Sequence, residues 1–271
     1  MFPSKPLRVA KHTSIVCGAA LALTACTTSE PTRSGFLSDY SLLEVRTDTV
    51  RAKIADYRNE ELLDTITAVY IEPVEIGGNI GTRFSEEERA MIRTEVDRQI
   101  CYEVSKRFDI AQENDPSAGR LRVAATRVTP TNAVGSVAST AANFFIPGPI
   151  GVRVPGSTGG LAAEAELLAP NGQQAAAVIW ARDAQVVGTD NPSLSRVGDA
   201  HRLTTAFGQL VATAISPEDS KSRPVPTPDP CLRFGPRHRA EGIISRIVTG
   251  IYTPELSGSS PPTTPPVPDQ D

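Results

Sequence analysis

Cys26 is the residue whose type and position most clearly predict a chemical reaction, because it ends the sequence Leu23-Thr24-Ala25-Cys26. Small residues directly before a cysteine are typical of a bacterial lipobox, in which the signal peptide is removed and diacylglycerol is joined to the thiol. Three basic residues (Lys5, Arg8, Lys11) and the apolar residues 15–23 precede it. We therefore predict that residues 1–25 are a lipoprotein signal peptide and that Cys26 is lipidated; the alternative is plain cleavage.

The predicted lipobox also indicates where in the cell the protein is located. Thr27 follows the cysteine, at the position where an aspartate would favour retention in the inner membrane. We therefore expect a lipid-anchored protein of the outer membrane that faces the periplasm. The remaining 246 residues carry a formal net charge of −7, which argues against nucleic acid as a partner. No later segment approaches the roughly 18 to 20 apolar residues of a spanning helix. The expected membrane contact is therefore the N-terminal lipid alone.

Two further cysteines are left to pair in an oxidising compartment. Cys101 and Cys231 are 130 positions apart, and a disulfide between them would close a long loop. Cys101 also lies in a predicted helix, where a cysteine can serve as a small buried apolar residue. The sequence leaves both alternatives open, since it does not supply the geometry of a bridge.

Catalytic patterns are sparse. The sequence has no His-Glu-x-x-His, paired Cys-x-x-Cys, Gly-x-Ser-x-Gly or Walker-type loop. Asp199, His201 and Ser195 are the best enzyme-like group, but positions 199 and 201 face different sides of a helix, and we expect His201 to be an exposed polar residue. The acidic run 86–88 fits a helix N-terminus, and the Gly-rich residues 156–160 lack a following lysine. We expect no catalytic residues, no metal and no cofactor.

The strongest candidate for a binding surface is an insertion, residues 132–160. It is rich in small residues, contains a possible helix at 133–145, and carries Phe144, Phe145, Ile146 and Ile150. If exposed, such apolar residues mark a partner or membrane contact. The alternative, which we favour slightly, is that they fold back over the sheet edge and complete the core.

The elements that must position these residues alternate between strand and helix. Apolar patterns predict strands at 66–76, 120–128, 161–169 and 174–187, with an Asn171-Gly172 hairpin turn between the last two. A capping box at Ser85 begins a helix to about Asp109, and a second helix runs over 194–215. This order predicts an α/β fold of the α+β type: a two-layer β-α-β-β-β-α sandwich with a mostly antiparallel sheet. Trp180, in the last strand, is expected to pack in the core.

One segment resembles a known family. Gly35-Phe36-Leu37-Ser38-Asp39-Tyr40-Ser41-Leu42-Leu43, shortly after the lipobox, is similar to the opening of an uncharacterised Gram-negative bacterial lipoprotein family, domain of unknown function 3313. The similarity extends to about Pro217. It implies an envelope lipoprotein and supplies no reaction, because the family has no established catalytic or binding residues to carry over.

The expected organisation has six parts: signal peptide 1–25, tether and ordered N-terminal arm 26–60, α/β domain 61–216, Pro-rich linker 217–236, short helix 237–252 and disordered Pro-rich tail 253–271. The linker should be extended and solvated. Together these features predict a non-enzymatic envelope protein that binds a protein or another envelope component. The alternatives are a small-molecule or glycan-binding lipoprotein with a pocket between insertion and sheet and, less favoured, a hydrolase with an unrecognised site.

Overall fold

The computed structural model describes residues 33–145, 150–237 and 239–258. The predicted signal peptide, Cys26, Ile146 and residues 259–271 lie outside these ranges. In the described part of the chain, eight strands form one sheet in the order β1-β2-β9-β8-β6-β3-β5, with β4 paired to β6. Their bounds are β1 Glu44–Val45, β2 Lys53–Arg58, β3 Ala68–Ile71, β4 Glu75–Ile76, β5 Asp109–Ile110, β6 Gly119–Thr129, β8 Gly160–Leu168 and β9 Gln174–Asp183.

The centre of the sheet is the antiparallel hairpin β8–β9, which the sequence predicted. Most residues of both strands are buried, and most of these are apolar, because both faces of the sheet are covered. The turn at Asn171-Gly172 uses the freedom of glycine at Gly172, whose φ is +82°. The pairs β1–β2, β2–β9, β9–β8 and β8–β6 are antiparallel. The pairs β3–β5, β3–β6 and β4–β6 are parallel. The sheet is therefore mostly antiparallel, as predicted.

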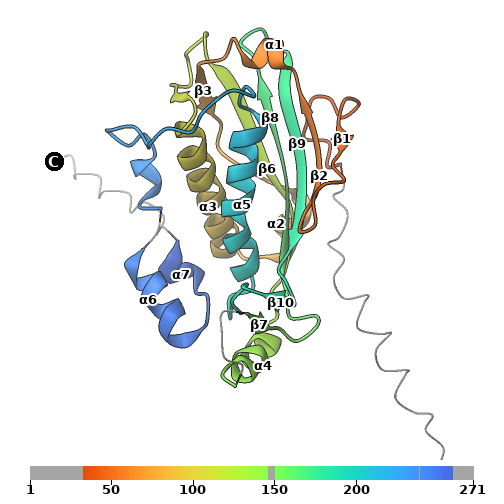
Figure 1. Ribbon diagram of the computed structural model, residues 1–271, viewed down its shortest axis with the longest axis vertical. Coiled ribbons are helices and arrows are strands. Elements are labelled where there is room, and N and C mark those ends of the chain that lie inside the picture. The colour runs from red at the N-terminus through yellow and green to blue at the C-terminus, as the bar shows by residue number, and fades with distance from the viewer. Residues whose placement is uncertain (1–32, 146–149, 238, 259–271) are drawn as a thin grey trace, which may run out of the picture.

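Two long helices cover one face of the sheet (Figure 1). The helices of the described residues are α1 Glu60–Leu63, α2 Gly78–Arg83, α3 Glu86–Ser105, α4 Ala133–Asn143, α5 Gly198–Ala214, α6 Ala240–Thr249 and α7 Pro254–Ser257, with a 3₁₀ turn at Leu232–Phe234. Ser85 begins α3 with the predicted capping box, in which the Ser85 hydroxyl accepts from the Glu88 amide and the Glu88 carboxylate accepts from the Ser85 amide. The predicted two-layer α/β sandwich is confirmed.

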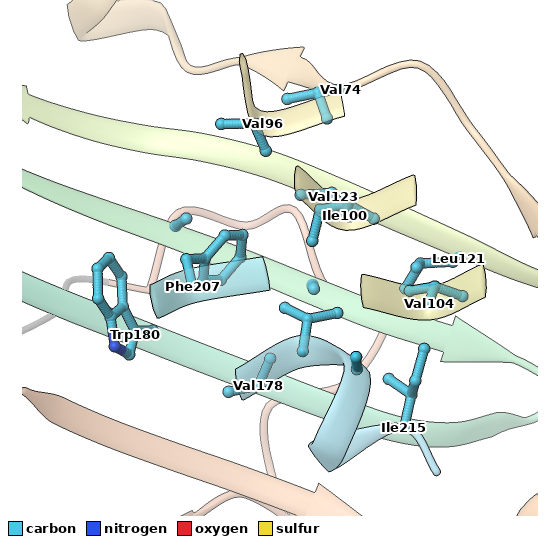
Figure 2. Packing of buried hydrophobic residues seen from close by; sticks show 14 of the residues in the cluster. Val74, Val96, Ile100, Val104, Leu121, Val123, Val178, Trp180, Phe207 and Ile215 are labelled. Carbon is cyan, nitrogen blue, oxygen red and sulfur yellow. The ribbon is translucent and has the colours of Figure 1, made fainter. Parts of the chain in front are cut away.

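Apolar side chains of α3 and α5 meet the strands in one continuous core. The predicted stripe of α3 is fully buried at Ile92, Val96, Ile100 and Val104. Trp180 of β9 packs against Phe207 of α5 with ring centroids 5.5 Å apart (Figure 2). Trp180 is thus a core residue, as its position in a strand predicted.

The opposite face of the sheet is covered by residues 33–43, which we call the N-terminal arm. Leu37 is buried there against Ala177 and Ile179 of β9. Beside this small cluster, Glu164 and Glu166 of β8 are fully buried carboxylates. A buried carboxylate is costly unless it is hydrogen-bonded, and most of the donors here come from the arm. The arm therefore completes the polar as well as the apolar side of this face.

Residues 53–58 differ from the prediction. They were assigned to the tether and arm, but they form β2, which pairs with residues 176–181 of β9. The apolar residues of β2 face opposite sides: Ile54 enters the main core and Tyr57 packs beside the arm. Alternation was absent from the sequence because both faces of this strand are covered.

The chain after α5 returns along the helix layer as residues 217–237 and 239–258, which we call the C-terminal strap. The predicted linker is not simply solvated: the Arg223 amide donates to the Lys106 carbonyl at the end of α3. The predicted short helix is α6, and Pro254–Ser257, predicted to be disordered, form α7. Tyr252 bonds back to the Pro192 carbonyl, so the strap is held against the domain.

Candidate functional site

The insertion forms a small subdomain at one end of the sheet (Figure 1). Asn132 caps α4, its side-chain oxygen accepting from the Gly135 amide at 3.1 Å. After α4, strand β7 (Gly151–Val152) pairs with β10 (Val187–Gly188) in a two-stranded ribbon. The possible helix that the small residues indicated is therefore present as α4, and the segment after it is not a plain loop.

The apolar residues of the insertion are exposed. Phe144 and Phe145 are 86% and 82% exposed and touch each other edge to face, with ring centroids 5.5 Å apart. Together with further exposed apolar side chains they form what we call the insertion surface: Val134, Val137, Phe144, Phe145, Ile150 and Val187. The expectation that Phe144, Phe145 and Ile150 fold back to complete the core is wrong. Ile146 lies outside the described residues.

The insertion surface also lacks charge along its sequence. From Pro130 to Val152 the chain contains no acidic, basic or histidine residue, although a fifth of the whole chain is charged. Burying a phenylalanine side chain is favourable by roughly 1.5 to 3 kcal/mol relative to leaving it in water, and an exposed phenylalanine forgoes this free energy. An uncharged surface with two adjacent exposed phenylalanines is typical of a binding site rather than of ordinary solvent-facing chain.

A buried ion pair fixes the insertion to the domain. Arg153 Nη1 lies 2.6 Å from Asp199 Oδ1, and both side chains are essentially inaccessible to solvent. The other Asp199 oxygen accepts from the Thr131 hydroxyl at 3.0 Å and from the Gly159 amide at 2.7 Å. Arg153 also donates to the Ser157 carbonyl. The Asp199 carboxylate, in the first turn of α5, thus holds both ends of the insertion. The insertion surface is therefore attached rigidly to the domain.

His201 is placed differently from the prediction. It is 2% exposed, its Nδ1 lies 2.7 Å from the Tyr252 hydroxyl, and its Nε2 lies 3.5 Å from Glu95 Oε2. Burial lowers the pKa of His201 below its ordinary value, which favours the neutral ring. It was expected to be exposed, but the C-terminal strap covers this side of α5 with Tyr252.

The structure does not join the enzyme-like residues into one site. Asp199 is occupied by Arg153, Thr131 and Gly159, whereas His201 bonds to Tyr252 of the strap. Ser195 is not a hydrogen-bond partner of either side chain. The Gly-rich segment 156–160 is also engaged, since its Gly159 amide and Ser157 carbonyl bond to the buried ion pair.

Cys101 of α3 and Cys231 of the strap form a disulfide, with Cα atoms 5.8 Å apart. Both residues are buried. The bridge closes a loop with a sequence separation of 130 residues. It attaches the strap to the helix layer at one point, and the Tyr252 contacts attach it at another.

Sequence reasoning missed the partners of these groups because they are distant along the chain. Arg153 and Asp199 are separated by 46 positions and His201 and Tyr252 by 51. No local spacing marks such pairs. Within the described residues, none of the helices combines the length and apolar content needed to cross a bilayer. In the same part of the chain, acidic, histidine and cysteine side chains nowhere gather in threes around a possible metal position.

Comparison with known proteins identifies the family. Residues 32–211 match the family model described as protein of unknown function (DUF3313). The chain belongs to this family. The match begins directly before the arm and ends in α5, so the DUF3313 part contains the sheet, α3 and the insertion. The strap lies beyond the match.

Other comparisons add little to the DUF3313 assignment. A search of curated proteins returns no match. Among solved structures, the PelC dodecamer from Paraburkholderia phytofirmans is similar at 9% identity and a TM-score of 0.35, covering 61% of this chain and 97% of that one. A DUF4136 family protein from Bacteroides thetaiotaomicron is similar at 7% identity and a TM-score of 0.29, covering 63% and 100%. At these scores neither likeness bears on the function.

Proposed function

We propose that this protein is a non-enzymatic envelope protein, lipid-anchored at Cys26 in the outer membrane, that binds a protein partner through the insertion surface. The observation that carries the proposal is the exposure of Phe144 and Phe145 directly after α4, in an insertion that a buried ion pair ties to the domain. Aromatic side chains that fill a pocket on a partner commonly supply most of the energy of an interface. Their burial on binding would remove the cost of exposing them in the free protein.

The chemistry of the insertion favours a protein over a lipid surface. Elements that lie on anionic membranes combine apolar residues with lysine and arginine, which attract the headgroups. The insertion has none between Pro130 and Val152. Its exposed helix positions are all valine or alanine: Val134, Val137, Ala138, Ala141 and Ala142. An apolar helix face of this kind can lie in a hydrophobic groove of a partner protein.

The proposed anchor restricts where the partner lies. Six residues separate Cys26 from Arg33, the first described residue, and the arm that follows is fixed on the sheet. At about 3.5 Å for each residue, this connection reaches at most roughly 25 Å. A domain lipidated at Cys26 therefore stays close to the membrane, and its partner must be reachable from there.

The proposal is tested by crosslinking in cells followed by mass spectrometry of the tagged full-length protein. The variant Phe144→Ser/Phe145→Ser should lose the dominant protein crosslink. The matched control Ile247→Ser/Val248→Ser removes exposed apolar residues from α6 and should keep it. Equal crosslinking of all three proteins, or no reproducible protein partner, contradicts the proposal.

The anchor is tested separately. Mass spectrometry of the mature N-terminal peptide should detect a diacylglycerol adduct on Cys26, and Cys26→Ser should move the protein out of the membrane fraction. An unmodified Cys26 in membrane-associated protein contradicts lipidation at this residue. Because this measurement does not involve the insertion surface, its failure is distinguishable from failure of the binding proposal.

A further inference from the structure

A cavity of about 230 Å³ lies between α3, α5 and the C-terminal strap. Four of its lining residues are arginines, Arg202, Arg237, Arg239 and Arg246, against a single acidic residue, Glu95. Such a concentration of positive charge is unusual in a chain whose formal net charge is −4. The sequence predicted, as an alternative function, a ligand pocket between insertion and sheet; this cavity lies elsewhere.

Glu95 does not neutralise the cavity, because its charge is already satisfied by its own neighbours. Its carboxylate bonds to Arg98, with which it forms a buried ion pair, and to the side-chain amide of Gln99 at 2.8 Å. Burial lowers the pKa of the nearby His201, which favours its neutral form, so the positive charge of the lining comes from arginine. The residues that line the cavity therefore carry more positive than negative charge.

The arginines differ in how far they are already paired. Arg202 lies 2.5 Å from Asp190, and Arg237 is paired with Glu103 and lies over the Tyr102 ring. Arg202 also lies 3.5 Å from Asp199, so its guanidinium is shared between two carboxylates. Arg246 makes no ion pair with any described residue. The guanidinium of Arg246 is therefore the lining charge that is left for a ligand oxyanion to pair with.

We propose that this cavity binds the anionic group of a single sugar-sized ligand, a carboxylate or phosphate held by arginine. Guanidinium groups bind both oxyanions with paired, charge-assisted hydrogen bonds. The volume is below the roughly 300 to 1,000 Å³ of pockets for drug-sized molecules, so one ring with one anionic group fills it. Thr205 and Ser257 also line the cavity, and hydroxyl side chains are suited to the hydroxyls of such a ring.

The site belongs to the C-terminal strap more than to the family domain. Seven of the eleven lining residues come from the strap, which lies beyond the DUF3313 match. The strap is attached by the Cys101–Cys231 disulfide, by Tyr252 against His201, and by Arg98, which donates to the Pro236 carbonyl. The cavity thus depends on the strap being docked. It is separate from the insertion surface, so the two proposals can fail independently.

The experiment is calorimetric titration of the full-length protein with D-glucuronate and with glucose 1-phosphate, with glucose as the uncharged probe. An oligomer of glucuronate tests whether the anionic unit comes from a polymer. The key variant is Arg246→Gln. It removes an exposed lining charge, and no described carboxylate loses an ion-pair partner as a result. Arg51→Gln is the control, because it removes an exposed arginine away from the cavity.

Binding of an anionic probe, absent for glucose and weakened at least tenfold in Arg246→Gln, supports the proposal; Arg51→Gln should bind like the unchanged protein. Partial recovery in Arg246→Lys would assign the effect to charge. Tighter binding of the oligomer than of the monomer would indicate a polymer end as the source. No binding of either monomeric anion or of the oligomer, or equal affinity in Arg246→Gln, overturns the proposal. Thermal unfolding of each variant verifies that the fold is intact.

Discussion

The Tyr40 hydroxyl lies 2.6 Å from Glu164 Oε2 and accepts hydrogen bonds from the backbone amides of Gly35 and Leu37. Ser34 adds two donors to the same carboxylate, and Ser38 gives its amide and hydroxyl to Glu166. The segment that resembles the family opening therefore satisfies two buried carboxylates on β8. Its role in this fold is structural.

Removing the Tyr40 hydroxyl should destabilise the domain. Tyr40→Phe keeps the ring but deletes a donor to a buried carboxylate, a loss of about 1 to 3 kcal/mol in the free energy of unfolding. Tyr57→Phe is the matched control, because the Tyr57 hydroxyl has no hydrogen bond within the described residues and the ring packs on the same face. Urea unfolding measures both. Equal stability of Tyr40→Phe and the unchanged protein would contradict this role.

The main layers were predictable because local patterns determine them. The buried stripe of α3, its capping box at Ser85 and the turn at Gly172 each follow from residues within one helix or hairpin. By contrast, the burial of His201 depends on Tyr252, 51 positions later, and that of Glu164 on Tyr40, 124 positions earlier. Sequence spacing carries no signal for such contacts. The exposure of Phe144 was one of two open alternatives, and the packing of distant segments decided it.

The Arg153–Asp199 pair should control the rigidity of the insertion. Asp199→Asn keeps the shape of the side chain but leaves Arg153 as a buried unpaired charge, which typically costs about 3 to 5 kcal/mol. Arg153 is the only lysine or arginine between Arg127 and Arg182. Trypsin cleavage after Arg153 should therefore be slow in the unchanged protein, in which this residue is buried, and fast in the variant.

The control for this experiment is Glu72→Gln, which removes an exposed ion pair with Arg120. Such pairs contribute roughly 0 to 1 kcal/mol, so cleavage after Arg153 should stay slow. Cleavage at the same rate in all three proteins would mean that the ion pair does not hold the insertion. Cleavage that accelerates at every basic residue of Asp199→Asn would indicate general unfolding instead, and would also contradict a local role.

Asp97 should make stability depend on pH. Burial raises the pKa of Asp97 to about 6, although its Oδ1 accepts from the Val74 amide at 3.0 Å. The folded state thus holds this proton more tightly than the unfolded state, whose pKa is near 3.8. The favourable contribution is present at low pH and is lost as the pH rises through about 6, a change of roughly 3 kcal/mol for a shift of about two units.

Asp97→Asn keeps an acceptor for the Val74 amide and removes the titration. The variant should be more stable than the unchanged protein at pH 7.5 and should lose this advantage near pH 4, as measured by urea unfolding at both pH values. Asp219→Asn, at an exposed position after α5, should show no such difference. An unchanged pH profile in Asp97→Asn would show that this carboxyl is not the group responsible.

The disulfide should hold the C-terminal strap rather than the sheet. By chain entropy, closing a loop of 130 residues stabilises the folded protein by up to about 5 kcal/mol. In Cys101→Ala/Cys231→Ala the strap keeps only its non-covalent contacts, among them the bond from the Tyr252 amide to the Pro192 carbonyl and the packing of Phe234 on the core. Native-state hydrogen exchange should therefore accelerate at Tyr252 and Arg223, while the paired amides of β8 and β9 stay protected. Reduction of the unchanged protein should reproduce this pattern. Equal loss of protection in the strap and in the hairpin would show that the bridge stabilises the whole domain, and unchanged protection at Tyr252 would show that the strap docks without it.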